Sequence, residues 1–264
     1  MSYEFLTVEK DGFVATVTLN RPDNLNALSA DLMHEICDVA DSFEYDVDTR
    51  AVIFTGTGKH FSAGADLKDP KRAAMADRTM NERRRHTHLG QKMATKLQAI
   101  SQITVAAING VALGGGGVIV SALDFRIGAD DCRVGYPEID RGMNLSWFGL
   151  PLCLRLVGPS RAKRMVILGQ MEDAETLLNW GFLDEVVPKD ELMDAARKMA
   201  DAYASKPPIP AQMIKRSANV LSGGIDQSLM HMDIDQFILT TMTNDYVEGV
   251  SSFMEKREPE FKGD

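Results

Sequence analysis

The 264-residue chain has few cysteines and no long hydrophobic run. Cys37, Cys132 and Cys153 form no Cys-x-x-Cys or Cys/His pattern, so neither a zinc site nor a disulfide framework is indicated. We expect buried free thiols and no metal. No apolar run reaches the ~18 residues that a membrane-spanning helix needs. The first residues lack the basic and apolar stretches of a signal peptide, and we therefore expect a cytoplasmic protein.

Positive charge is also scarce. Lys and Arg number 29 against 38 Asp and Glu, which gives a formal net charge of −9. This balance argues against nucleic acid or an anionic membrane as a partner. The densest basic run is Arg83 to Arg85, interpreted as a solvated helix face, with contact to ligand phosphates as the alternative. His86 and His88 follow it. We interpret both as solvated, and a second acid/base group is the alternative.

Hydrophobic periodicity predicts strands that alternate with helices through about residue 187, and helices after it. Ser29 is a candidate N-cap for a helix reaching Phe43, and Gly181 is a candidate C-cap for a later one. Residues 70–85 are polar and weakly periodic, which predicts a mobile loop that runs into a helix. This order indicates an α/β core with a helical C-terminal extension. The predicted strands are 13–19, 51–55, 104–109, 125–129, 132–136 and 184–187.

Two segments of small residues each follow a buried strand: FSAGADL at 61–67 and NGVALGGGG at 109–117. Small residues let a ligand approach the main chain, and a glycine run that enters a helix leaves its first N–H groups unpaired. The positive end of that helix favours negative charge. Neither GxxxxGK[ST] nor the GxGxxG dinucleotide fingerprint is present. Taken alone, the run of four glycines at 114–117 leaves close packing and anion binding as equal alternatives.

Taken together, the two segments resemble the signatures of the crotonase (enoyl-CoA hydratase/isomerase) family. The match continues in order along nearly the whole chain, through NRP, NALS, YPEI, DEVVP and GVSSFMEKREPEF. The resemblance implies an α/β fold: a spiral of ββα units over residues 1–205 and a helical C-terminal trimerisation region over 206–264. It also implies a homotrimer or dimer of trimers, and an acyl-CoA thioester substrate with no separate cofactor.

The resemblance also assigns a binding site. It implies that the backbone N–H groups of Ala65 and Gly115 form an oxyanion hole for the thioester oxygen. One such donor stabilises a transition state by typically ~3 kcal/mol. Coenzyme A would lie along Ala63, Ala65 and Leu67, with ligand phosphate meeting Lys68 and the C-terminal helix, from this or a neighbouring subunit. On that helix the contacts would be Phe253 and Lys256. A solvated surface lysine is the alternative for Lys68 and Lys256. The family often has a lysine where this chain has Asp23.

The acid/base residues depart from the family pattern. Hydratases of the family use two glutamates, and the matching positions here are Val118 and Glu138. One carboxylate beside an apolar wall is suited to carrying a proton at a raised pKa. This pattern is similar to mitochondrial-type enoyl-CoA isomerases, in which one glutamate moves a proton between two carbons of a 3-enoyl thioester. A feruloyl-CoA hydratase-lyase relative also works with one glutamate, so hydration stays open.

A second departure lies at residues 144–149, where the family commonly has Pro-Gly-x-Gly-Gly and this chain has NLSWFG. We interpret Trp147 and Phe148 as core packing. The alternative is a differently shaped acyl pocket, with a polar contact from Asn144 or Ser146. We therefore expect isomerisation or hydration of an enoyl-CoA. The alternatives are thioester hydrolysis or C–C cleavage, and a non-catalytic acyl-CoA- or RNA-binding module, the RNA version being weakened by the net charge.

Overall fold

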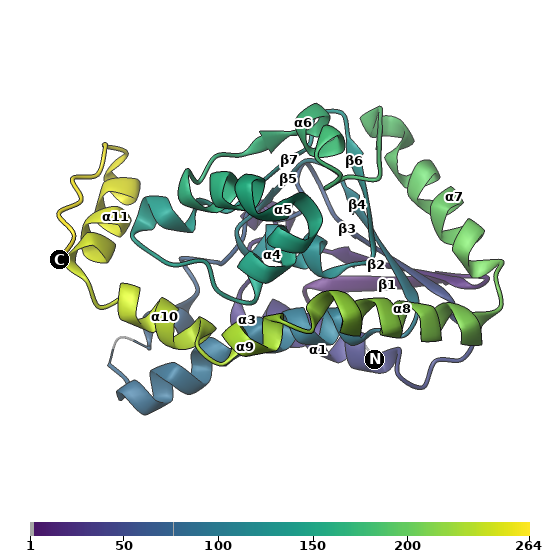
Figure 1. Ribbon diagram of the computed structural model, residues 1–264, viewed down its shortest axis with the longest axis horizontal. Coiled ribbons are helices and arrows are strands. Elements are labelled where there is room, and N and C mark those ends of the chain that lie inside the picture. The colour runs from purple at the N-terminus through teal and green to yellow at the C-terminus, as the bar shows by residue number, and fades with distance from the viewer. Residues whose placement is uncertain (1–2, 76) are drawn as a thin grey trace.

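A computed structural model describes residues 3–75 and 77–264, and its core is a six-stranded sheet with the order β1-β2-β3-β4-β6-β9 (Figure 1). β1 (Leu6–Asp11) pairs antiparallel with β2 (Val14–Leu19). The other neighbours in this sheet run parallel. They are β3 (Ala51–Gly56), β4 (Ile103–Ile108), β6 (Phe125–Ala129) and β9 (Glu185–Val187). β3 and β4 are buried throughout, as expected for parallel strands covered on both faces.

A second, three-stranded sheet has the order β5-β7-β8. It consists of β5 (Val111–Leu113), β7 (Arg133–Gly135) and β8 (Glu172–Asp173). The chain passes from a strand of the large sheet to a strand of the small sheet and then into a helix. β4 and β5 lead into α4 (Gly115–Ala122), and β6 and β7 lead through the short helix η2 (Pro137–Arg141) into α5 (Gly149–Ile167). These repeated ββα turns confirm the predicted crotonase-like spiral.

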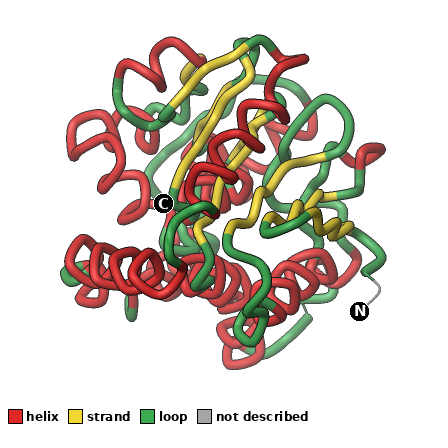
Figure 2. Tube along the Cα trace, turned by 90° about the vertical axis from the view of Figure 1, so that its right-hand side faces the viewer, coloured by secondary structure: helices red, strands yellow, loops and turns green. Residues whose placement is uncertain are grey.

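The helices cover the large sheet on both sides (Figures 1 and 2). α7 (Leu192–Ala204) packs over β2, β3, β4 and β6, while α1 (Ala30–Ser42) packs against α3 (Met80–Ala99). Ser29 caps α1, because its side chain accepts a hydrogen bond from the Leu32 amide at 3.3 Å. Gly181, at φ +76, follows α6 (Ala174–Asn179). Both predicted caps are confirmed.

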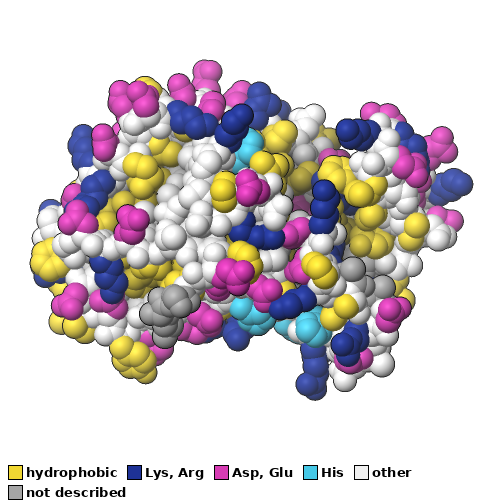
Figure 3. Space-filling view, turned by 180° about the vertical axis from the view of Figure 1, so that it is seen from behind, with side chains coloured by type: hydrophobic (Ala, Val, Ile, Leu, Met, Phe, Trp, Pro, Cys, Tyr) yellow, Lys and Arg dark blue, Asp and Glu magenta, His cyan; other side chains and the backbone are white. Residues whose placement is uncertain are grey.

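After α7 the described chain is helical, as predicted. α8 (Pro208–Gly223) runs beneath the sheet, and α9 (Asp226–Met230) and α10 (Asp233–Thr240) continue toward α11 (Asn244–Glu255) at the far end (Figure 1). From behind, the surface is hollowed between the larger body and the smaller part at the right (Figure 3). The division into 1–205 and 206–264 stays a prediction. No helix among the described residues is long and apolar enough to cross a membrane.

Two local predictions need correction. β1 was not predicted, because Glu9, Lys10 and Asp11 are exposed on this edge strand and hide its alternation. Residues 70–85 are more helical than expected: α2 (Pro70–Ala73) is followed by α3, which begins at Met80. The side chain of Thr79 and that of Glu82 form a capping box there, which fixes the start of α3. Residue 76, within this stretch, lies outside the described residues.

Candidate active site

Residues 61–67 and 111–117 are held side by side by a short parallel bridge between Ser62 and Ala112. The Ser62 amide donates to Val111 O at 3.1 Å, and the Leu113 amide donates to Ser62 O at 3.0 Å. Gly64, at φ +85, lies where the two segments touch. A Cβ there would lie 2.6 Å from Leu113 O and 3.4 Å from the nitrogen of Gly115, so only glycine permits this approach.

Two amide N–H groups at this junction have no partner. Leu28 forms a bridge opposite Ala65: its amide donates to Gly64 O and its carbonyl accepts from the Asp66 amide. These two hydrogen bonds involve the carbonyl of Gly64 and the amide of Asp66, the residues on either side of Ala65, and the Ala65 amide itself takes part in neither. Gly115 is the first residue of α4, where an amide has no intrahelical acceptor. Within residues 3–75 and 77–264, neither amide has a hydrogen-bond acceptor. Together they suit an anionic oxygen.

Both residues line a pocket of about 420 Å³. The pocket brings together every site residue predicted from the sequence except Lys256. Lys256 is exposed and ends α11 at φ +57, so its role in phosphate binding stays a prediction. The predicted residues that line the pocket are Ala63, Ala65, Leu67, Lys68, Gly115, Val118, Glu138, Trp147 and Phe253.

The carboxyl group of Glu138 lies against the glycine run. A Cβ on Gly114 would be 2.5 Å from Glu138 Oε1. Gly114 also has φ +50 and ψ −117, a combination that is closed to residues with a side chain. The Oε2 atom of Glu138 is buried and has no hydrogen-bond partner in the described part of the chain. Burial raises the pKa of Glu138 to about 7, and the nearby charge of Arg141 opposes this rise. Such a carboxyl can both take up and return a proton near neutral pH.

Among the described residues that line the pocket, no carboxylate other than Glu138 is both buried and without an ion-pair partner. Val118, where the resemblance implied the second glutamate of a hydratase, is 1% exposed and gives the pocket an apolar wall. Asp66 is paired with Arg21, with 3.0 Å between Oδ2 and Nη2. Asp23 is exposed at the pocket mouth. Glu138 is therefore the carboxyl group whose proton affinity the burial of the pocket can adjust.

Sequence reasoning missed several lining residues, among them Arg141, Met143 and Phe237. The guanidinium carbon of Arg141 lies 4.1 Å from the centre of the Phe253 ring, and its Nε atom is buried without a partner in the described structure. A basic residue three positions after Glu138 is a signal that could have identified it. Phe237 comes from α10 and had no local signal, because its approach depends on how the C-terminal helices fold back.

Several candidates lie outside the pocket. His86 and His88 are exposed on α3. Arg84 is bound to Asp235 through two hydrogen bonds of 2.6 Å and 3.1 Å, which agrees with a solvated helix face. Asn144 donates from Nδ2 to the side chain of Gln236 on α10 at 3.2 Å, so it ties two segments together.

Ser146 is buried and lines the pocket beside Trp147. Phe148 does not line it and is buried in the core, as interpreted. Trp147 is partly buried, packs against the core and also lines the pocket, so both interpretations of its role apply.

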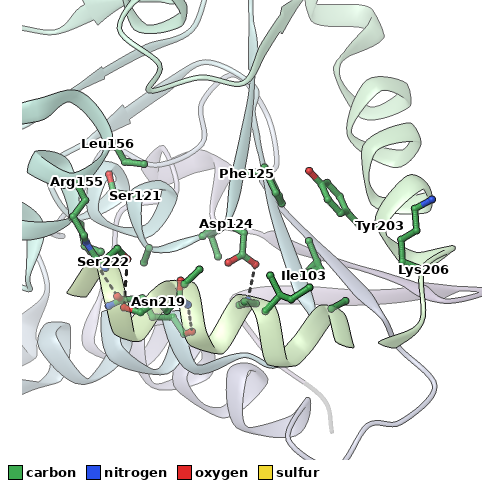
Figure 4. Close-up of a pocket in the computed structure, with 18 of the residues that line it drawn as sticks. Ile103, Ser121, Asp124, Phe125, Arg155, Leu156, Tyr203, Lys206, Asn219 and Ser222 are labelled. Atoms are coloured by element: carbon green, nitrogen blue, oxygen red, sulfur yellow. Dashed lines mark hydrogen bonds and ion pairs between the residues drawn. The ribbon is translucent and has the colours of Figure 1, made fainter. Parts of the chain in front are cut away.

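A second cavity, of about 660 Å³, lies between α8 and the core (Figure 4). Its most buried charges are already paired: Lys215 Nζ lies 2.6 Å from Asp124 Oδ2 and also donates to Gln102 O. Arg155 lies 3.3 Å from Asp226. The three cysteines are buried free thiols, as predicted. The described residues contain no cluster of three metal-ligating side chains. The pocket around Glu138 is therefore the candidate active site.

Comparison with known proteins finds similarity along nearly the whole chain. The sequence model for the family described as enoyl-CoA hydratase/isomerase matches residues 9–264. A crotonyl-CoA hydratase from Syntrophomonas wolfei is 34% identical over 99% of both chains. A short-chain-enoyl-CoA hydratase from Clostridium acetobutylicum is 34% identical over 98% of both. The crystal structure of a carnitinyl-CoA hydratase from Mycobacterium avium is similar with a TM-score of 0.87 at 29% identity, and covers 100% of both chains.

Proposed function

The chain belongs to the enoyl-CoA hydratase/isomerase (crotonase) family, and from that premise we propose that it moves the double bond of a 3-enoyl-CoA into conjugation with its thioester. Glu138 is the acid/base residue of this proposal. The amides of Ala65 and Gly115 form the oxyanion hole. The coenzyme A part lies along Ala63, Leu67 and Lys68.

In the proposed reaction, the Glu138 carboxylate removes a proton from C2 of the thioester. The electron pair of that C–H bond moves onto the thioester oxygen, and a dienolate forms. The two amides donate hydrogen bonds to this oxygen as its negative charge grows, which lowers the barrier. The protonated Glu138 then returns the proton to C4, and the double bond ends between C2 and C3. One carboxyl group performs both transfers, and no water is consumed.

The observation that carries this proposal is the isolation of Glu138 beside Val118, with a pKa raised to about 7. An acid/base group works best when its pKa lies near the working pH. Hydration is a second candidate, and the names of the relatives favour it, since those reported above are all hydratases. It requires a water molecule to be activated with one carboxyl group instead of two.

The test offers 3-butenoyl-CoA and 2-butenoyl-CoA separately to the wild type and to Glu138→Gln. The products are separated by liquid chromatography, which resolves the two isomers, and their masses are then measured. Isomerisation converts the first ester into the second without a change in mass. A product that gains one water from the second ester, formed faster than isomerisation, would replace the proposal with hydration. Release of free coenzyme A would instead indicate thioester hydrolysis. Unchanged rates in Glu138→Gln would remove Glu138 from the mechanism.

We also propose that the chain assembles as a homotrimer or a dimer of trimers. Large hydrophobic side chains are exposed along α8 and the helices after it, and apolar surface of this kind marks interaction sites. Sedimentation equilibrium would test this, and a monomer at micromolar concentration would contradict it. The cytoplasmic location and the absence of a separate cofactor stay predictions. The exposed residues include Ile209, Met213, Val220, Leu221, Ile225 and Leu239.

A further inference from the structure

Trp147 and Phe148 occupy a turn that does not suit them. Their φ angles are +59 and +63, and the turn is closed by a hydrogen bond of 3.0 Å from the Gly149 amide to Ser146 O. Two successive positive φ values in a four-residue turn are typical of type I′, which glycine, asparagine and aspartate dominate. Bulky aromatic residues persist in such a conformation only where their surroundings fix it.

The indole ring of Trp147 is wedged between two glycines. A Cβ on Gly90, in α3, would lie 2.0 to 2.2 Å from the atoms Cε2, Cδ2 and Nε1 of the ring. A Cβ on Gly115 would lie 2.3 Å from Cζ3, on the opposite edge. Gly115 carries one of the two unpaired amides, so the ring stands directly beside the place proposed for the thioester oxygen.

A third element holds the turn from the other side. Asp233, the first residue of α10, is 9% exposed, and its Oδ2 accepts a hydrogen bond from the Phe148 amide at 3.4 Å. Burial raises the pKa of Asp233, and the Trp147 amide, like the Phe148 amide, opposes this rise. The Trp147 side chain is thus fixed through its ring by α3 and α4 and through its backbone by α10.

From this arrangement we infer that Trp147 is a specificity-determining residue that ends the acyl pocket beside the reacting carbons and restricts the enzyme to compact acyl groups. Gly90 provides the space for the ring, and Asp233 is a positioning residue that acts through the turn. The inference rests on the proposed function and deepens it, since it names the substrate class of the same site.

The test measures kcat and KM for butenoyl, hexenoyl and decenoyl esters of coenzyme A. The wild type prefers the butenoyl ester. In Trp147→Ala we expect kcat/KM for the decenoyl ester to rise at least ~tenfold. The reason is that each methylene group of the substrate that becomes buried in an apolar pocket raises kcat/KM by about tenfold or more. For Trp147→Phe we expect a kcat/KM for the decenoyl ester between those of the wild type and Trp147→Ala. An unchanged preference in Trp147→Ala would overturn the inference.

Gly90→Ala supplies the complementary arm. The new methyl group forces the ring toward Gly115, and we expect turnover of the butenoyl ester to fall by about 100-fold, as a misplacement of about 1 Å can cause. The double variant Gly90→Ala/Trp147→Ala regains most of that activity because the clash is gone. If the double variant is folded by circular dichroism but does not regain turnover of the butenoyl ester, the claim that Gly90 provides the space for the Trp147 ring would be contradicted.

Asp233→Ala and Asp233→Asn test the positioning role. Alanine removes the acceptor and broadens the chain-length preference in the same direction as Trp147→Ala, whereas asparagine keeps an oxygen and retains the wild-type preference. A structural role alone would lower stability in both variants and leave the preference unchanged, and that result would overturn the role of Asp233.

A fluorescence titration tests this inference independently of the proposed reaction. The chain has 2 tryptophans, so Trp180→Phe leaves Trp147 as the one fluorescent indole. Butyryl-CoA should change its emission, and free coenzyme A should have a much smaller effect. If no enoyl ester is turned over, the proposed reaction fails while this titration still decides whether Trp147 meets the acyl group. Equal responses to both ligands would refute that contact.

Discussion

Replacing Glu138 with glutamine should lower kcat strongly and at the same time stabilise the folded protein at alkaline pH. Burial raises the pKa of Glu138 from its ordinary value of 4.5 to about 7. A group with a raised pKa contributes its full stability below the unfolded value and loses it as the pH rises through the folded value. At about 1.4 kcal/mol for each tenfold change in acidity, the wild type loses up to about 3 kcal/mol between pH 4.5 and pH values well above 7.

Glutamine carries no such charge, so the Glu138→Gln variant escapes that loss. The assay is urea unfolding at about pH 5 and about pH 8.5, at one protein concentration, because assembly also affects stability. The difference in free energy of unfolding between variant and wild type should grow by about 2 to 3 kcal/mol toward the higher pH. The same variant should lose about 10²- to 10⁴-fold in kcat, the usual contribution of a general acid/base.

Glu44→Gln, an exposed residue just after α1, controls for the loss of one carboxylate. A stability difference for Glu138→Gln that does not change with pH would refute the reasoning, because it would mean that the folded protein does not penalise the charged form. A large pH-dependent gain with full activity would separate the burial of Glu138 from catalysis and would contradict the proposed mechanism.

Further predictions concern the same pocket and the second cavity. The kcat/KM of the wild type should rise about tenfold per pH unit below about 7 and level off above it, because the base must be ionised before it takes the proton. Gly114→Ala should lower kcat by about 100-fold, since its methyl group meets the Glu138 carboxyl, and should cost about 1–3 kcal/mol in urea unfolding through backbone strain. Val118→Glu should raise the yield of hydrated product relative to isomerised product, measured by liquid chromatography with mass detection, because it supplies a second carboxyl group. Lys215→Met should destabilise the fold by up to about 3 kcal/mol in the same unfolding assay, since it leaves the half-buried carboxylate of Asp124 with its hydrogen bonds from Thr104 but without its cation.

Matched controls exist for these variants. Gly12→Ala places a methyl group at φ +59 with nothing within 4 Å, so it carries strain without a clash and should leave kcat unchanged. Lys206→Met removes a positive charge at the edge of the second cavity and should change stability little. A flat pH profile, equal effects of the two alanine variants on kcat, or a neutral Lys215→Met would each contradict the corresponding reasoning.

The parts of the site that sequence could predict are those set by local backbone chemistry. The two small-residue segments indicated a close approach to the main chain, the resemblance to the family singled out the amides of residues 65 and 115, and both residues line one pocket. Ser29 was identifiable as a helix cap because its hydrogen bond spans three residues. The predicted order of strands and helices placed the glycine run at the start of a helix, where α4 begins.

The missed parts depend on contacts between distant residues. Asp233 binds the Phe148 amide across 85 positions, and no periodicity encodes that contact. Trp147 was predicted as a pocket residue only as the alternative to core packing, because aromatic residues usually pack in the core. The turn with positive φ and the gap left by Gly90 became evident only in three dimensions. The edge strand β1 was missed for a local reason. Its last three residues are all exposed, so the sequence does not show the alternation of apolar and polar residues that is typical of a strand.

The central claim is that the amides of Ala65 and Gly115 bind one thioester oxygen next to Glu138. A crystal structure with butyryl-CoA, which has no double bond to react, tests this most directly. We expect the thioester oxygen to lie about 2.7–3.1 Å from both nitrogens, with C2 facing the Glu138 carboxyl. An oxygen bound elsewhere, or two amides that point away from it, would contradict the claim.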